Sequence, residues 1–522
     1  MNLIEDCWIP VLRENGLKEL IAPWQLTDKF GTNPIVALAA PRPDFQGGLM
    51  QFLIGLLQTV TPPEEDGEIE WEDWLEEPPT PETLRQSFEP YIDCFNLDGD
   101  GPRFMQDLEL NGADTVEIGT LLIDTPGENT VKRNTDHFVK RGGAQKLCYS
   151  CTATALYTLQ ISAPSGGSGH RTSIRGGGPL TTLLKIDPEG SGVNQDFLWH
   201  NVWLNVLDKS IISDRGNRPI EKKSVFLWLA PTRTSEKTTG CATHAENVHP
   251  VHMYWCIPRR FRLEFGQVGE GVCDICNSRN TKVVTEVQQK ALGVNYEGVW
   301  RHPLSPHWID EQGEPSPLHP QPGGFTYRHW SNWVESTNTH QPATVVRDFK
   351  SRMQKTEQLR IWAFGYDMDN AKPRNYYDST FPLFLFDKKE VSNVFSIRLQ
   401  EHIEASTMVA GFVSSCVKNA KKNLRKSLIE ESCFTRTEDS FFQSISLLGK
   451  ELKDGKDGKE TLASWYNVLV KEGITLFEEY AERDDAALVD MKQVALARKK
   501  LKEQLYGKKL KAVLHLPTGK RG

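Results

Sequence analysis

The sequence predicts an α+β protein. A large mixed α/β domain with a zinc-binding element, over residues 1–380, precedes a C-terminal helical bundle over residues 381–522. Three observations support this prediction. The first part contains short apolar runs broken by Gly, Pro, Asn and Asp, and it carries two CxxC pairs. The second part is rich in helix-forming residues and has no proline between residues 390 and 516.

The overall composition is that of an ordinary globular protein of two or three domains, with 522 residues, 38% of them hydrophobic and 25% charged. No stretch approaches the roughly 20 apolar residues that cross a bilayer, so we expect no membrane contact. The opening, MNLIEDCWIPV, has acidic residues where a secretory signal carries basic ones. We therefore expect a cytoplasmic protein whose ten cysteines are mostly reduced.

Apolar runs in the first part indicate its core elements. Residues 224–229 (SVFLWL) and 252–257 (HMYWCI) are typical of buried strands. Residues 49–60 (LMQFLIGLLQTV) predict a core helix that is too short to span a bilayer. These elements, with long loops between them, indicate a mixed α/β domain.

The second part contains four helical segments, at about 390–430, 437–452, 459–482 and 484–507. In the third segment Leu462, Trp465, Leu469 and Phe477 recur near helical spacing and form one apolar stripe. Such segments cannot bury their stripes alone, so they predict a helical bundle.

Cys148 and Cys151 form one CxxC pair, and Cys273 and Cys276 form a second, with 121 residues between the pairs. Together they can give one Zn²⁺ ion four thiolates in a closed tetrahedral site. Four cysteine ligands favour a structural zinc ion, because catalytic zinc keeps one position open. Two unrelated pairs and a redox dithiol are the alternatives.

A glycine-rich segment, residues 162–182 (SAPSGGSGHRTSIRGGGPLTT), follows the first cysteine pair. It contains neither a P-loop nor a dinucleotide fingerprint. Its backbone can approach a surface closely, and Arg171 and Arg175 beside it suit phosphates. We call four of its residues the glycine loop: Gly166, Gly167, Ser168 and Gly169. An ordinary flexible loop is the alternative.

Charge is distributed unevenly. The net charge is −8, but ten acidic residues and no Lys or Arg lie between Glu64 and Glu82, so the remainder is slightly basic. Residues 131–146 (VKRNTDHFVKRGGAQK) place five basic residues around Phe138. Basic residues near an exposed ring suit single-stranded nucleic acid, although an ordinary surface loop has the same composition.

No catalytic motif is found: the sequence contains no nucleophile elbow, HExxH or kinase-type set. We therefore assign no catalytic residue and do not expect an enzyme. His244, His249 and His252 lie near two cysteines, but their spacing fits no standard metal site. A zinc-stabilised nucleic-acid-processing enzyme with its site among these histidines is the main alternative.

Several segments occur in an order that is more specific than any one of them. They are NLIEDCWIPV at the start, FMQ (104–106), the two CxxC pairs, RGGGPLTT (175–182) and WRHPLSPH (300–307). Together they resemble the CasA family, the large subunits of the type I-E CRISPR Cascade complex. The resemblance covers essentially the whole chain and implies a mixed N-terminal domain followed by a C-terminal four-helix bundle.

The resemblance also implies a function in antiviral defence. A subunit of this family binds beside the guide RNA and other Cascade subunits, and it recognises the short protospacer-adjacent motif (PAM) in double-stranded target DNA. The resemblance implies that the subunit reads the PAM from the minor groove, whose pattern of hydrogen-bond donors and acceptors is degenerate. Base pairing with the guide RNA then supplies sequence specificity. The subunit then starts duplex unwinding and R-loop formation and recruits a separate helicase-nuclease.

Residue by residue, the resemblance places the glycine loop and Lys290 against the minor groove. Residues 365–374 (GYDMDNAKPR) match a hairpin that wedges into the duplex. Asp369 and Asn370 form its tip, where the family pattern has an Asn-Gln pair, so the motif preference stays open.

Phe138 and Lys140 fall in a loop that, in the family, contacts the RNA end and the neighbouring subunit. A purely architectural subunit, in which the glycine loop and the hairpin are passive, is the second alternative.

Overall fold

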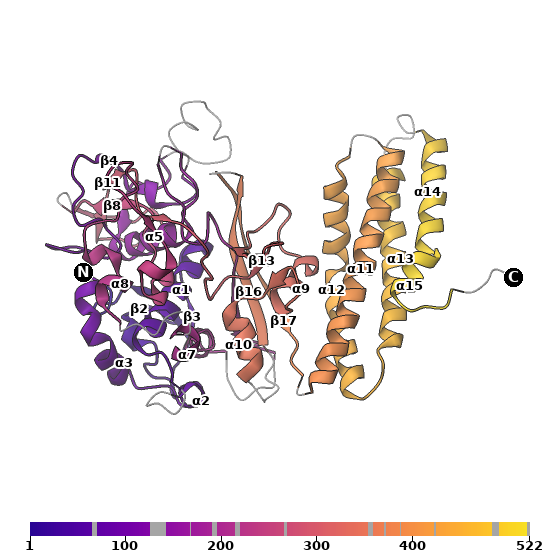
Figure 1. Cartoon of the computed structure of the whole chain (residues 1–522), viewed down its shortest axis with the longest axis horizontal. Helices are drawn as coiled ribbons and strands as arrows, with labels where there is room; N and C mark the ends of the chain where they lie inside the picture. Colours follow the sequence, from indigo (N-terminus) through magenta and orange to yellow (C-terminus); the bar gives the residue numbers. More distant parts are fainter. Residues whose placement is uncertain are drawn as a thin grey trace. The chain divides into compact units, whose positions relative to one another are not determined.

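The structure is a computed structural model that describes most of the chain. The described residues are 1–64, 70–125, 142–167, 169–189, 196–213, 220–265, 269–352, 359–369, 372–386, 388–421, 424–482 and 490–518. They form two units, both drawn in Figure 1. Unit 1 contains Met1–Pro320, Asn338–Arg352 and Leu359–Phe381; unit 2 contains Gln321–Thr337 and the chain from Pro382 onward.

Helix α1 (Pro43–Val60) is the buried centre of unit 1. Of its 18 residues 15 are buried, as expected for a helix enclosed on all sides. Gly48 faces Thr158 of α5 (Tyr149–Ser162), and a Cβ there would lie 2.3 Å from Thr158 Oγ1. Only glycine lets the two helices approach this closely. The core helix predicted at 49–60 is confirmed.

Aromatic rings fill the space beside α1. The ring of Phe52 meets those of Phe95, Phe104 and Trp255 edge to face, at centroid distances of 6.1, 6.0 and 5.7 Å. Trp228 meets Phe104 in the same way at 5.3 Å. These rings come from distant segments, so their packing joins the long loops into one core.

Two of the predicted strands are helical turns instead. Residues 224–229 span the end of α8 (Lys222–Val225) and the 3-10 turn η4 (Leu227–Leu229). Residues 252–257 begin within the 3-10 turn η6 (Pro250–Tyr254). The strand prediction was wrong for both, because a short buried apolar run has the same composition in a strand and in a helical turn.

Small sheets surround this core. Their strands, in spatial order, are β2 (Lys18–Ile21), β1 (Ile9–Arg13) and β3 (Ile35–Leu38); β5 (Leu147–Cys148), β10 (Thr281–Val284) and β9 (Gly269–Gly271); β4 (Asp114–Glu117), β11 (Glu286–Lys290) and β8 (Arg260–Leu263); β12 (Asn295–Tyr296) and β7 (Ala242–Thr243); β14 (Pro315–Pro317), β13 (His307–Ile309) and β15 (His340–Gln341); and β17 (Lys372–Leu383), β16 (Leu359–Asp369) and β6 (Thr181–Ile186).

Short helices complete unit 1. They are η1 (Pro23–Gln25), α2 (Trp71–Glu76), α3 (Pro81–Phe88), η2 (Glu89–Cys94), η3 (Ile118–Leu121), α6 (Leu198–Trp203), α7 (Lys209–Ser213), η5 (Ala245–Asn247) and α10 (Thr344–Arg352).

Unit 2 is a bundle of long helices, which Figure 1 shows side by side. They are α11 (Lys389–Ala420), α12 (Lys426–Lys453), α13 (Lys459–Glu482) and α14 (Met491–Leu505), followed by the short α15 (Lys508–Val513). Leu462, Trp465, Leu469 and Phe477 of α13 are each 0% exposed, so the predicted apolar stripe is confirmed. The predicted α+β fold class, with its C-terminal four-helix bundle, is confirmed as well.

The boundary between the first two bundle helices differs from the prediction of segments at 390–430 and 437–452. Helix α11 ends at Ala420 and α12 begins at Lys426. The residues between them include no glycine or proline, so the composition does not mark the break.

A short helix from earlier in the chain, α9 (Tyr327–Val334), belongs to unit 2. The Tyr327 ring stacks on Phe441 of α12 with centroids 3.9 Å apart, and its hydroxyl lies 2.8 Å from Thr437 Oγ1. Trp330 Nε1 donates to the backbone oxygen of Pro382 (3.0 Å). Among the described residues, no helix has both the length and the apolar composition needed to cross a membrane.

Candidate zinc centre and nucleic-acid interface

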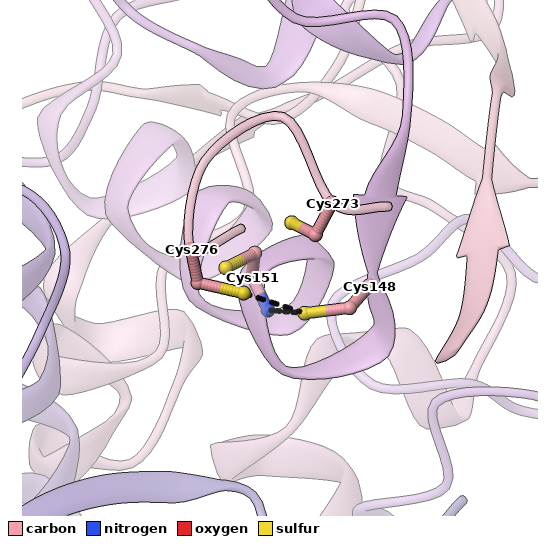
Figure 2. Close-up of side chains that lie close together, drawn as sticks. All are labelled: Cys148, Cys151, Cys273 and Cys276. Carbon is pink, nitrogen blue, oxygen red and sulfur yellow. Dashed lines mark hydrogen bonds between the residues drawn. The ribbon is translucent and has the colours of Figure 1, made fainter. Parts of the chain in front are cut away.

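The two CxxC pairs meet in unit 1. Their Sγ atoms all lie within 4.8 Å of one another, and the Sγ atoms of Cys148 and Cys276 are 3.6 Å apart. Cys148 and Cys151 lie at the start of α5, and Cys273 and Cys276 lie in the turn between β9 and β10. Figure 2 shows the four side chains converging on one point. This convergence rules out two unrelated pairs.

Backbone pairing holds the two cysteine segments together. Cys148 of β5 lies opposite Val283 of β10, and the backbone N–H of Cys151 donates to Cys148 Sγ (3.5 Å). Asp274, inside the second CxxC, accepts the backbone N–H groups of Gln145 and Lys146 at 2.7 and 2.8 Å. No local sequence pattern marks Asp274, because its role depends on a segment 128 residues away.

The four sulfurs fit a structural zinc ion. A tetrahedron with Zn–S distances of about 2.3 Å has sulfur–sulfur edges of about 3.8 Å, close to the observed spacing. Hydrogen bonds from Cys148 and Cys151 lower the pKa values of Cys273 and Cys276, whereas hydrogen bonds within the quartet raise those of Cys148 and Cys151. Thiolate formation is therefore favoured at the second cysteine pair. With four protein ligands, the ion would have no open position for substrate.

The glycine loop has a backbone that favours glycine. Gly167 and Gly169 have φ angles of +63° and +85°, in the left-handed region. The backbone N–H of His170 donates to Gly167 O (2.8 Å) and closes the turn. Gly166 and Gly167 are exposed, whereas Ser168 lies outside the described residues.

The structure brings the glycine loop to the strand that carries Lys290. The backbone N–H of Leu292 donates to Gly169 O (2.9 Å), and a Cβ on Gly169 would lie 2.6 Å from Leu292 Cδ2. Gln289 Nε2 lies 3.3 Å from His170 Nδ1. Two segments about 120 residues apart in the sequence are therefore neighbours in space.

Lys290 is the last residue of β11 and lies opposite Arg260 of β8. Its Nζ donates to the backbone oxygen of Asn111 (2.8 Å). Arg260 pairs instead with Asp107, whose Oδ2 is 2.6 Å from Arg260 Nε. Among the described residues, the ammonium group of Lys290 therefore contacts only a carbonyl oxygen, while the charge of Arg260 is neutralised by Asp107.

Two further cations beside the glycine loop lack an acidic partner in the described chain. Arg171 Nε donates to Ser235 Oγ (2.8 Å), and the Arg259 guanidinium donates to a backbone oxygen. Burial lowers the pKa of Arg259 to about 10, so it stays charged at neutral pH. With Lys290, these residues leave positive charge that an anion can neutralise. Arg259 was not among the residues predicted from the sequence, because only the fold brings it to this loop.

Arg175, which the sequence also places near the glycine loop, is almost fully buried. Its guanidinium donates to Gln51 Oε1 (2.6 Å), Thr181 Oγ1 (3.0 Å) and Ser305 Oγ (3.3 Å). It connects the glycine-rich segment to α1 and β6 and is not accessible to a phosphate.

The segment expected to form a hairpin provides β16 and β17. Asp369 is the exposed last residue of β16, and Asn370 lies outside the described residues. Below the tip, Arg374 Nε lies 3.2 and 3.1 Å from the two carboxylate oxygens of buried Asp367. This ion pair joins the two strands. Phe138 and Lys140 also lie outside the described residues.

The histidines do not form a second metal site. His252 is 0% exposed, with its ring nitrogens 2.7 Å from Val225 O and 2.9 Å from the Tyr296 hydroxyl. His249 Nδ1 accepts the backbone N–H of Val251 (3.3 Å). In the part of the chain that the structure describes, the cysteine quartet is the one group of metal-ligating side chains that converges.

Several solved structures of CRISPR-associated proteins share this fold. Thermobifida fusca Cse1 matches with a TM-score of 0.69 and 15% identity, covering 99% of each chain. Thermus thermophilus CasA, also called Cse1, matches with a TM-score of 0.64 and 15% identity over 97% of this chain and 99% of that one. A chain of a CRISPR RNA-guided surveillance complex matches with a TM-score of 0.61 and 12% identity, again over 97% and 99%.

The sequence itself defines the family. The family model of CRISPR-associated protein Cse1 matches residues 2–476. The chain belongs to the Cse1 family, and the resemblance to CasA is confirmed.

Proposed function

We propose that this chain is the large subunit of a type I-E Cascade complex. It binds beside the guide RNA and other Cascade subunits, and it reads the PAM of double-stranded target DNA from the minor groove. It then starts duplex unwinding and R-loop formation and recruits a separate helicase-nuclease, acting in the cytoplasm without catalysis of its own. Family membership and the fold match to a surveillance-complex chain support this proposal.

The observation that carries the proposal is the group of unneutralised cations around the glycine loop. Gly166 and Gly167 are exposed and carry no side chain, so their backbone can enter a groove. Lys290, Arg171 and Arg259 supply charge for phosphates and groove acceptors, and no carboxylate of the described residues pairs with them. In this proposal Gly166, Gly167, Ser168, Gly169 and Lys290 contact the minor groove.

The hairpin has the proposed role of a wedge. A wedge must stay rigid while it separates stacked bases, and the ion pair between Asp367 and Arg374 stiffens the strands below the tip. Asp369 and Asn370 would meet the first base pairs, whereas Phe138 and Lys140 would contact the RNA end or the neighbouring subunit. We propose Zn²⁺ as the structural ion of the cysteine quartet.

A gel-shift titration tests the proposal. The guide complex is reconstituted with and without this subunit and titrated with two guide-matched duplexes that differ only in the adjacent motif. We expect tight binding to need both the subunit and one motif class. We also expect Lys290→Ala to reduce the preference between the motifs, while Lys18→Ala, an exposed lysine on β2, leaves it unchanged.

Three results would contradict the proposal. Binding that ignores the motif would leave an architectural role, as would intact preference in the Lys290→Ala complex. Metal-dependent cleavage of DNA by the isolated subunit would instead indicate an enzyme.

A further inference from the structure

A second loop lies directly beside the glycine loop. The backbone N–H of Ser235 donates to Leu292 O (3.1 Å), and Ser235 Oγ accepts from Arg171 Nε (2.8 Å). Leu292 is also the residue that holds Gly169. Both loops are therefore attached to the same residue after β11. We call residues 233–241 the lysine turn.

The lysine turn has a defined shape. The backbone N–H of Cys241 donates to Thr234 O (2.9 Å), and that of Gly240 donates to Glu236 O (2.8 Å). A Cβ on Gly240 would lie 2.3 Å from Glu236 N and 2.4 Å from Thr234 O, so the turn closes only around glycine. Its base is fixed by the contacts of Ser235.

The exposed tip of the turn is Lys237, Thr238 and Thr239. The one acidic residue of the turn, Glu236, faces other partners: its Oε1 lies 3.8 Å from a guanidinium nitrogen of Arg260, and its Oε2 accepts from Thr239 Oγ1 (3.1 Å). In the described chain, Lys237 has no ion-pair or hydrogen-bond partner. The tip therefore presents an unneutralised ammonium group to solvent.

We propose that the lysine turn is a further contact to the same duplex, in which Lys237 binds the phosphate backbone. Phosphate contacts fix the register of a protein on a duplex without reading sequence. Since both loops are attached at Leu292, a phosphate held by Lys237 would position the groove for the glycine loop and Lys290. This inference rests on the proposed function and deepens it with a positioning residue.

The test is a salt titration of binding by the reconstituted guide complex, with the two duplexes used above. A lost phosphate contact lowers the slope of log K against log salt by about 0.9, which corresponds to about five-fold weaker binding at 0.15 M salt. We expect Lys237→Ala to show both effects equally on the two duplexes. Lys237→Arg should restore binding, and Lys18→Ala serves as the matched exposed lysine.

A second variant changes the position of Lys237 without removing its charge. Gly240→Ala forces the turn to open, so we expect it to weaken binding to both duplexes while the motif preference stays intact. Incorporation of each variant into the complex is measured in parallel, for example by size-exclusion chromatography.

Three outcomes would overturn the inference: an unchanged salt slope in Lys237→Ala, a changed motif preference in this variant, or reduced incorporation, which would indicate contact with a neighbouring protein subunit. These outcomes are separate from failure of the proposed function, which appears in the wild-type complex as binding that ignores the motif.

Discussion

At the scale of single residues, the cysteine quartet has the clearest chemistry. Cys273 and Cys276 have pKa values below those of ordinary thiols because hydrogen bonds from the first pair stabilise their thiolates. Asp274 between them fixes the turn through two backbone N–H groups. One short turn therefore supplies two metal ligands and also accepts the hydrogen bonds that hold the first cysteine segment beside them.

Replacing one ligand should release the metal. In Cys276→Ser the site keeps three thiolates, so we expect bound zinc to fall from about one ion per chain to near zero. We also expect the free energy of unfolding to fall by about 3 kcal/mol or more, as for the loss of a structural metal. Elemental analysis and thermal unfolding measure the two effects. Cys7→Ser, at an exposed cysteine, is the control; full zinc content in Cys276→Ser would exclude the quartet as the site.

At the scale of elements, the hairpin of β16 and β17 depends on an ion pair whose two side chains differ in their exposure to solvent. Asp367 is almost fully buried, whereas Arg374 is 43% exposed. Removing the arginine leaves a buried carboxylate without its partner, which is the costly way to break such a pair. The strands below the tip should then lose rigidity.

We therefore expect Arg374→Ala to slow strand separation more than it weakens initial duplex binding. A fluorescent base analogue beside the motif reports opening, and a gel shift reports binding. Arg360→Ala, near the other end of β16, should affect neither. Equal losses in both measurements would instead indicate that Arg374 serves binding.

Elements with a continuous pattern were predictable from sequence, and those defined by distant contacts were not. Helix α1 and the stripe of α13 follow from their own residues. Residues 224–229 were misassigned because aromatic packing from other segments decides their conformation. The spacing of the four cysteines is enough to predict a metal site from the sequence. The proximity of the glycine loop and Lys290, by contrast, depends on the path of β11 in the fold. Arg259 has no local signal at all.

At the scale of the whole molecule, each unit buries a neutral histidine. Burial lowers the pKa of His252 in unit 1 and of His402 in unit 2 to about 4, from an ordinary value of 6.5. His402 Nδ1 lies 2.7 Å from Arg398 O, and its Nε2 lies 3.2 Å from Ser444 Oγ. Because the unfolded chain binds these protons more readily, stability is present above about pH 6.5 and is lost as the pH falls toward 4.

We expect each histidine to lower the free energy of unfolding by about 2 kcal/mol between pH 7 and pH 5. Urea unfolding at the two pH values measures the loss. His402→Gln, which cannot titrate, should reduce the pH dependence of the bundle and leave that of unit 1 unchanged. A pH dependence of the bundle equal to that of the wild type would show that other groups cause it.

The distance in sequence between the two cysteine pairs has a consequence for biosynthesis. At about 5–20 residues per second, the ribosome adds the second pair about 6–24 s after the first. Until then Cys148 and Cys151 form an incomplete metal site whose thiols can be oxidised. The glycine loop also lacks its hydrogen bond from Leu292 and its neighbouring strand β11. Reducing conditions and metal supply during this interval therefore matter more for correct maturation than they do once the chain is complete.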